Sequence, residues 1–444
     1  MKRSLRIYGA HTRRGRKRLE RLLGRGRLVL DRKTLRKVER IVTRVRRGGD
    51  GALLEAVRKY DGLEAGGIAD LKLAPAESDR GAWDLPEGFA TALDRAVAAV
   101  EAFHRPQVHP GYALPGEENP QDDGIQLVEH RRALRRVAVY IPGGRASYPS
   151  TAVMTVVPAQ LAGVEEIVAV TPPRAYRAMP ALRYTLDRLG VREVWGMGGA
   201  HAVAALAYGT ESVPRVDKIV GPGNAWVTAA KRTVVGDVAI DGLAGPTEVV
   251  IAADGDTDPA TDPRWVAADL LAQAEHDPLA AAVLITDRRR FAKAVAKAVE
   301  EQLDDLATAD TARASLRRFG CALVVESMDE ALPLIQAIAP EHLQLVGPEA
   351  EALEPRVTHA GAVFLGAATP EVFGDYVAGP SHVLPTCGSA RFSSALGVED
   401  FIRRSHTVRF SPSAAERWAE AAAVLADAEG LPAHAEAARR RMRS

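Results

Sequence analysis

The chain has 444 residues, of which 47% are hydrophobic and 26% charged, as in ordinary globular proteins. This length predicts roughly two to four domains. No run of about 18 apolar residues occurs, and Lys2, Arg3 and Arg6 stand where a signal peptide would need an apolar core. The sequence therefore predicts a cytoplasmic protein with no membrane span. Cys321 and Cys387 are too few for a disulfide framework.

Basic residues gather at the start of the chain, although the net charge is only +1. Residues 1–50 hold 19 Lys or Arg against 4 Asp or Glu, and the remainder holds 39 against 53. A basic arm is typical of nucleic-acid binding. The same region, however, carries an apolar stripe at helical spacing, formed by Leu35, Val38, Ile41, Val42 and Val45. We therefore interpret the charges as the solvated face of a packed helix and predict no nucleic-acid partner.

Helical patterns continue over residues 52–60, after a cap at Asp50, and over residues 87–103. Residues 111–125 are rich in Gly, Pro, Asn and Asp, which predicts a loop. From Arg136 onward, helical patterns separate short apolar segments at 137–141, 167–170, 193–196, 218–220, 249–252, 282–286, 322–325 and 362–365. This alternation is typical of parallel sheets covered on both faces. Because residues 242–248 interrupt it, we predict an α/β fold with two related, incomplete Rossmann-like sheet domains.

Glycine-rich turns follow three of these segments, at residues 142–144, 196–199 and 221–224. None completes the G-x-G-x-x-G dinucleotide motif, because His201 and Trp226 occupy the place of the third glycine. Each turn alone is therefore explained more simply as a tight turn of an α/β domain. Glycine at such a turn nevertheless lets backbone N–H groups approach a phosphate closely.

The segment L-L-A-Q-A-E-H-D-P-L at residues 270–279 carries a candidate metal site. It follows a helical pattern that Pro278 ends, and Gln273 and His276 are three residues apart, so a helix would place both on one side. An amide oxygen and an imidazole can share one ion, but zinc needs about four ligands. A histidine that caps a helix C-terminus explains His276 equally well.

Eight segments, in order between about residues 30 and 440, together resemble the histidinol dehydrogenase family. They are Y-I-P-G-G-R at Tyr140, L-A-Y-G-T-E-S-V-P at Leu206, D-K-I-V-G-P-G-N at Asp217, L-A-G-P-T-E at Leu243, the Q-x-x-H segment at Leu270, A-P-E-H-L at Ala339, G-D-Y-V-A-G-P-S-H-V-L-P-T at Gly374 and A-R-F-S-S at Ala390. The resemblance implies zinc-dependent, NAD-linked oxidation of L-histidinol to L-histidine through L-histidinaldehyde, in histidine biosynthesis. The alternative is a paralogous zinc and NAD dehydrogenase that acts on another amino or hydroxy alcohol.

The resemblance also assigns residues. It implies one Zn2+ per subunit, with the ligands Gln273, His276, Asp375 and His434. It implies Glu341 and His342 as the catalytic acid/base pair, and Tyr140, His201 and Asn224 as NAD contacts. The implied substrate contacts are Thr247, Gln273, His276, His342, Asp375, His382, Glu429 and His434.

Three positions depart from the family pattern. His201 stands where the family usually has Gln, Thr247 where it has Ser, and Ser381 where it has Asn. None of these changes removes an implied ligand or acid/base group. They bear on cofactor affinity more than on activity.

The expected organisation follows from these segments together. It comprises a basic N-terminal arm (1–30), a first α/β domain with the metal and acid/base residues (31–135 plus 250–384), a second, NAD-binding α/β domain (136–249) and a C-terminal helical tail (385–444). The tail has too little apolar surface to form a domain by itself. The resemblance implies that it crosses to a second copy, so that a homodimer has shared active sites.

Overall fold

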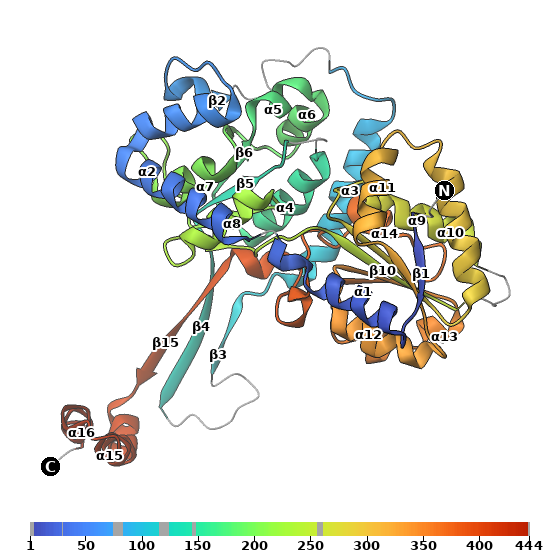
Figure 1. The fold of residues 1–444 in the computed structure, drawn as a ribbon. Coiled ribbons are helices and arrows are strands. Elements are labelled where there is room, and N and C mark those ends of the chain that lie inside the picture. The colour runs from blue at the N-terminus through green and yellow to red at the C-terminus, as the bar shows by residue number, and fades with distance from the viewer. Residues whose placement is uncertain are drawn as a thin grey trace.

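The computed structural model describes residues 4–28, 30–73, 83–114, 124–143, 148–254 and 261–442. Two six-stranded sheets covered by helices form the body of the molecule, and a long antiparallel arm extends from it (Figure 1). Gly144 and Arg145 of the Y-I-P-G-G-R segment lie outside the described residues, as do residues 115–123 of the expected loop.

The first sheet has six parallel strands in the order β1-β12-β11-β10-β13-β14. Its strands are β1 (Arg6–Gly9), β10 (Glu248–Ala253), β11 (Ala281–Thr286), β12 (Cys321–Val324), β13 (His342–Val346) and β14 (Ala362–Leu365). Every residue of β10, β11 and β13 is buried, which explains the apolar runs of β10 and β11, whereas Gln344 interrupts the apolar run of β13. The four strands predicted for this sheet are confirmed, whereas β1 and β13 were not predicted.

The second sheet repeats the same pattern, in the order β2-β7-β6-β5-β8-β9. Its strands are β2 (Lys72–Leu73), β5 (Arg136–Tyr140), β6 (Glu166–Thr171), β7 (Glu193–Gly196), β8 (Lys218–Val220) and β9 (Ala239–Ile240), parallel except for β2. In each sheet a central strand, β5 or β10, has the next two strands of the chain on one side and later strands on the other. The predicted α/β fold with two related parallel sheets is therefore confirmed.

Helices cover both faces of the second sheet. One buried cluster includes residues of α2 (Arg32–Ala56), α7 (Gly199–Tyr208) and α8 (Ala225–Val234), and the opposite cluster includes residues of α3 (Phe89–His104), α4 (Pro149–Ala162) and α6 (Pro180–Arg188). Short α5 (Pro173–Ala178) precedes α6. The sequence assigned residues 31–135 to the first domain, but α2 and α3 pack on the second sheet. The apolar stripes of α2 and α3 indicated that both helices pack on a core. Only the folded structure shows which sheet each of them covers.

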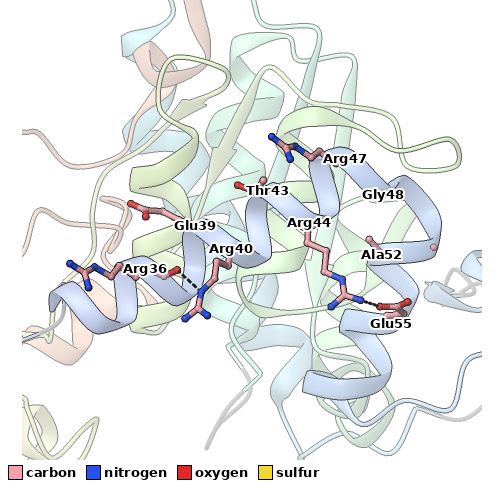
Figure 2. A pocket seen from close by; sticks show the side chains of 10 residues that line it. Arg36, Glu39, Arg40, Thr43, Arg44, Arg47, Gly48, Ala52 and Glu55 are labelled. Atoms are coloured by element: carbon pink, nitrogen blue, oxygen red, sulfur yellow. Dashed lines mark hydrogen bonds and ion pairs between the residues drawn. The ribbon is translucent and has the colours of Figure 1, made fainter.

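The outward face of α2 carries the expected charges. Val38, Val42 and Val45 are buried against the second-sheet core, while Arg36, Arg40 and Arg44 are exposed. Figure 2 shows these side chains along the helix, with Arg44 paired to Glu55. The basic residues of this helix thus form its solvated face, as predicted.

The N-terminal segment is part of the first sheet. β1 pairs in parallel with β12, with Tyr8 opposite Leu323, and α1 (Arg13–Leu23) contributes Leu22 to a cluster under that sheet. The same cluster includes residues of α12 (Ala331–Ile338) and α13 (Pro348–Glu351), and the other face packs α9 (Pro263–Ala274), α10 (Arg289–Leu303) and α11 (Ala309–Arg318). Within the expected basic N-terminal arm (1–30), β1 therefore forms an edge of this sheet and α1 packs against it. Local sequence could not indicate this, because the partner strand of β1 comes much later in the chain.

A third sheet forms the extended arm. It is antiparallel, in the order β15-β4-β3, and contains β3 (Gly111–Leu114), β4 (Ile125–Ala133) and β15 (Ile402–Phe410). The expected loop at 111–125 and helical tail at 385–444 thus each contain a strand. Beyond β15, helices α15 (Pro412–Ala428) and α16 (Pro432–Arg439) lie at the far end of the arm, away from both parallel sheets (Figure 1). In the part of the chain that the structure describes, no helix is long and apolar enough to cross a bilayer.

Candidate functional site

A cavity of about 360 Å³ lies between one edge of the first six-stranded sheet and one edge of the second. From the second sheet it receives the turns that follow β5 and β8, with Pro142, Gly223 and Asn224 in its wall. These adjacent strands lie where the strand order reverses, which is the usual ligand-binding position in an open α/β sheet. From the first sheet it receives Thr247 and Glu341, which precede β10 and β13. The cavity thus joins the carboxyl edge of one sheet to the amino edge of the other.

A chain of hydrogen bonds runs from the Q-x-x-H segment to Glu341. Gln273, in the last turn of α9, donates from Nε2 to the Thr247 hydroxyl at 3.0 Å. The Thr247 hydroxyl donates in turn to Glu341 Oε2, and the Glu248 N–H donates to the same oxygen at 3.1 Å. Thr247 therefore supplies the hydroxyl that this series of hydrogen bonds requires, although the family usually has Ser at this position.

Burial makes Glu341 a weak acid. Removal of the carboxyl from water raises the pKa of Glu341 to about 8, although the Thr247 hydroxyl opposes the shift. The neighbouring Glu248 carboxylate raises this pKa further. A carboxyl group with a pKa near neutrality can exchange a proton with water or substrate at physiological pH.

Adjacent His342 lies on β13 and has a defined tautomer. Its Nδ1 lies 3.3 Å from the backbone carbonyl oxygen of Glu248, which can only accept, so Nδ1 carries the proton. Nε2 is then an unprotonated acceptor, 3.7 Å from Asp375 Oδ1. Burial lowers the pKa of His342, with the Asp375 charge acting in the opposite direction. The imidazole is therefore suited to act as a base through Nε2.

Asp375 and His276 line the same cavity as His342. Asp375 lies in α14 (Glu371–Tyr376), and its backbone oxygen lies 2.9 Å from His382 Nδ1. His276 follows the end of α9, which stops at Ala274 rather than continuing to Pro278. The structure thus brings His276, His342, Asp375 and His382 to one cavity.

The donor set at this cavity fits a zinc ion. Gln273 Oε1 is buried and has no hydrogen-bond partner among the described residues, so an amide oxygen remains available as a ligand beside Thr247. With the imidazole of His276 and the carboxylate of Asp375 it offers three zinc-compatible donors. Within the described ranges, no group of three or more His, Cys, Asp or Glu side chains is placed to hold a metal. A four-coordinate zinc site would need one ligand in addition to these three donors.

Glu371 is a site residue that the sequence did not indicate. It is the first residue of α14, is almost completely buried, and has Oε2 at 3.8 Å from His342 Nδ1. Burial raises the pKa of Glu371 well above its ordinary value, and Asp375 and Asp269 add to the shift. The only sequence signal was its position four residues before Asp375, since a lone Glu at a helix start ordinarily indicates a solvated first turn.

Tyr140 and His201 lie together at the carboxyl edge of the second sheet. The Gly199 N–H donates to the Tyr140 hydroxyl at 3.1 Å, and burial raises the pKa of Tyr140 to about 12. His201 Nε2 lies 2.9 Å from Asp61 Oδ2, so the ring that replaces the usual Gln faces a carboxylate. Asn224 caps α8 by accepting from two backbone N–H groups, and it also lines the cavity.

Glu429 and His434 are not close to the other candidate residues within this chain. Glu429 follows α15 and His434 lies in α16, and both are exposed. These helices lie at the far end of the arm, away from both six-stranded sheets (Figure 1). A single copy of the chain therefore brings together all the implied metal and substrate residues except these two.

Comparisons with known proteins identify the family of this chain. The sequence model of the family described as histidinol dehydrogenase matches residues 27–442. The histidinol dehydrogenase of a Synechococcus species is 46% identical over 408 residues, 92% of each chain, and that of Rhizobium meliloti is 46% identical over 90% of this chain and 89% of its own. The crystal structure of histidinol dehydrogenase from Elizabethkingia anophelis has a TM-score of 0.88 at 30% identity, and covers 99% of this chain and 98% of its own. A match that extends over both sheets, the cavity between them and the arm places this chain in the histidinol dehydrogenase family.

Proposed function

We propose that the chain oxidises L-histidinol to L-histidine through L-histidinaldehyde, with NAD as acceptor and one zinc ion per subunit. The observation that carries this proposal is the convergence, on one cavity, of a buried imidazole base, a buried weakly acidic carboxyl and the zinc-compatible donors of His276 and Asp375, with Gln273 bonded to Thr247 of the cavity wall. The same cavity opens to the turns after β5 and β8, which suits a dinucleotide.

Specific residues of the chain would hold zinc and NAD. Gln273, His276 and Asp375 would hold zinc together with His434 from a second copy of the chain, and Tyr140, His201 and Asn224 would contact NAD. When bound, zinc supplies a Lewis-acidic centre that fixes the substrate, and NAD supplies the hydride acceptor.

In the first oxidation, His342 acts as the base. Its Nε2 takes the hydroxyl proton of histidinol while the carbinol carbon loses a hydride. The Glu248 carbonyl accepts from Nδ1–H and stabilises the imidazolium that forms. The product of this step is histidinaldehyde.

In the second oxidation, Glu341 acts first. Its carboxylate takes a proton from a water molecule as the water oxygen adds to the aldehyde carbon. The imidazolium of His342 returns its proton to the carbonyl oxygen, which forms the diol and restores His342 as a base. His342 then takes a hydroxyl proton from the diol while the same carbon loses a second hydride, and the acid results. Two hydrides leave the substrate in total, and water supplies the second oxygen of the carboxylate.

The reaction stoichiometry tests the proposal. We expect two NADH for each L-histidinol consumed, and loss of activity when a chelator removes the metal, followed by recovery when zinc is added. An amino alcohol without an imidazole ring is the matched control, and we expect no measurable oxidation of it. Faster oxidation of that control than of histidinol would instead support the paralogous dehydrogenase.

A further inference from the structure

A buried arginine of the N-terminal segment lies behind the proposed acid/base pair. Arg25 follows α1 and precedes residue 27, where the family match begins. Its side chain is only 1% exposed and forms a buried ion pair with Glu248. Arg25 Nη2 also donates to the backbone oxygen of Pro246 at 2.9 Å, and the guanidinium lies 5.9 Å from the ring centroid of Phe319.

Both oxygens of Glu248 have fixed partners. Oε2 accepts from Arg25, and Oε1 accepts from the Cys387 N–H at 2.9 Å. The neighbouring Gly26 lies close to Cys387, since a Cβ added at Gly26 would lie 3.2 Å from the Cys387 Cβ. The N-terminal segment therefore fixes the position of the chain at the start of β10.

The Thr247–Glu248 segment holds the two acid/base residues. The Thr247 hydroxyl and the Glu248 N–H donate to Glu341, and the Glu248 carbonyl sets the tautomer of His342. A shift of this short segment would misplace both groups at once. Buried ion pairs resist such a shift, because loss of one partner leaves the other charge uncompensated.

We propose that Arg25 is a positioning residue for histidinol oxidation. It fixes the Glu248 carboxylate, and the Glu248 backbone then orients Glu341 and His342. This inference rests on the proposed function. It adds a role for a segment that the sequence predicted only as a basic N-terminal arm.

Four variants and a matched control test the inference. We expect Arg25→Ala to lower kcat roughly 10- to 100-fold, as is usual for residues that orient a site through another group. The KM for histidinol should change less than about threefold, and the zinc content should equal that of the parent, because no substrate or metal contact is removed. Arg25→Lys should recover part of the loss, because an ammonium keeps the charge opposite Glu248 but lacks the planar guanidinium that lies over the Phe319 ring.

Glu248→Gln, alone and combined with Arg25→Ala, tests whether Arg25 acts through Glu248. The double variant should be no slower than the slower single variant, since both changes break the same link. The control is Arg18→Ala, which removes another buried arginine of the segment. Arg18 donates to backbone oxygens of Leu316, Arg318 and Gly320, and not to the site. We expect a kcat within about twofold of the parent for this variant.

The outcomes separate the two proposals. A parent enzyme that does not oxidise histidinol overturns the proposed function and this inference with it. An active parent whose folded Arg25→Ala variant keeps its kcat overturns this inference alone. The same holds if Arg18→Ala lowers kcat equally, if Arg25→Ala loses its zinc, or if the single losses multiply in the double variant.

Discussion

Burial determines the protonation states of the two proposed acid/base residues. Glu341 and His342 are neighbours in the chain and both are buried, yet burial raises the pKa of the first to about 8 and lowers the pKa of the second. Both shifts favour the neutral form, since removal from water penalises either charge. The pair therefore combines an imidazole ready to accept a proton with a carboxyl group that ionises near neutral pH.

The pH dependence of the aldehyde step should reveal the ionisation of Glu341. The rate of histidinaldehyde oxidation is expected to rise as pH increases through about 8, because the carboxylate form is the one that accepts the proton of water. Glu341→Gln should lower this rate at least about 100-fold and remove the rising limb. Steady-state rates over the pH range, measured with aldehyde as substrate, check this, and an unchanged limb in the variant would assign it to another group.

The stability of the same variant provides the control for misfolding. The folded pKa of Glu341 lies above the ordinary 4.5, so the folded protein keeps a proton that the unfolded chain loses. This carboxyl therefore reduces stability as pH rises from about 4.5 to about 8. In the metal-free protein, Glu341→Gln should melt no lower than the parent above pH 8. Thermal unfolding of both proteins measures this.

Metal binding should depend on the side chain of His276. His276→Asn removes one of the ligands proposed for zinc, and we expect loss of both bound zinc and activity because the remaining donors hold the ion too weakly. His109→Asn, a change at an exposed histidine, is the matched control and should keep its metal. Metal analysis of the purified proteins decides the matter, and full zinc occupancy in His276→Asn would remove this residue from the ligand set.

At the scale of elements, the turns at the carboxyl edge of the second sheet shape the cavity. Gly221, directly after β8, has φ +105°, and a Cβ there would lie 2.2 Å from the backbone oxygen of Tyr140. Only glycine permits this close approach of the β8 turn to the end of β5. The adjacent strands can then place Pro142 and Asn224 in one wall of the cavity.

Gly221→Ala should therefore destabilise the protein and weaken NAD binding. We expect Gly221→Ala to lower the free energy of unfolding by about 1–3 kcal/mol more than Gly236→Ala does. Gly236 has a similar φ of +101°, but no atom lies within 4 Å of an added Cβ, so this control shares the backbone strain without the steric clash. Denaturant unfolding and NAD titration measure the two effects. Equal losses in both variants would show that backbone strain alone accounts for them.

At the scale of the whole molecule, the arm separates Glu429 and His434 from the cavity that the resemblance implies they serve. A second copy that places its arm on the first would supply both residues. Exposed apolar side chains along the arm and its terminal helices are compatible with such a contact, among them Tyr112, Val408, Trp418 and Leu425. The homodimer with shared sites thus remains our proposal for the assembly.

Mixed dimers test this assembly. His276→Asn and His434→Asn chains should each be inactive, and their co-refolded mixture should regain up to about a quarter of the parent activity, because one site of each mixed dimer has both residues intact. The control mixes His276→Asn with Glu341→Gln. Both changes lie in the same half of the shared site, so no recovery is expected. Absence of recovery in the first mixture, despite isolated mixed dimers, would contradict sharing of His434.

Local patterns were sufficient for much of the fold and site. Fully buried strands such as β11 gave unbroken apolar runs, and the resemblance to the family supplied Gln273, His276, Asp375 and the Glu341–His342 pair as candidates. These features depend on neighbouring residues or on burial, and a buried segment can be recognised by its own apolar composition. The sequence alone therefore determined the α/β class, the two sheets and most of the cavity.

Long-range pairing was decided only by the tertiary structure. The strands of the arm are half-buried or exposed and carry few apolar runs, so nothing local marked β4 and β15 as partners. The Arg25–Glu248 ion pair joins residues 223 positions apart, and each residue alone looked like an ordinary surface charge. Periodicity shows that a segment is buried, but its partner is set by which surfaces meet when the whole chain folds.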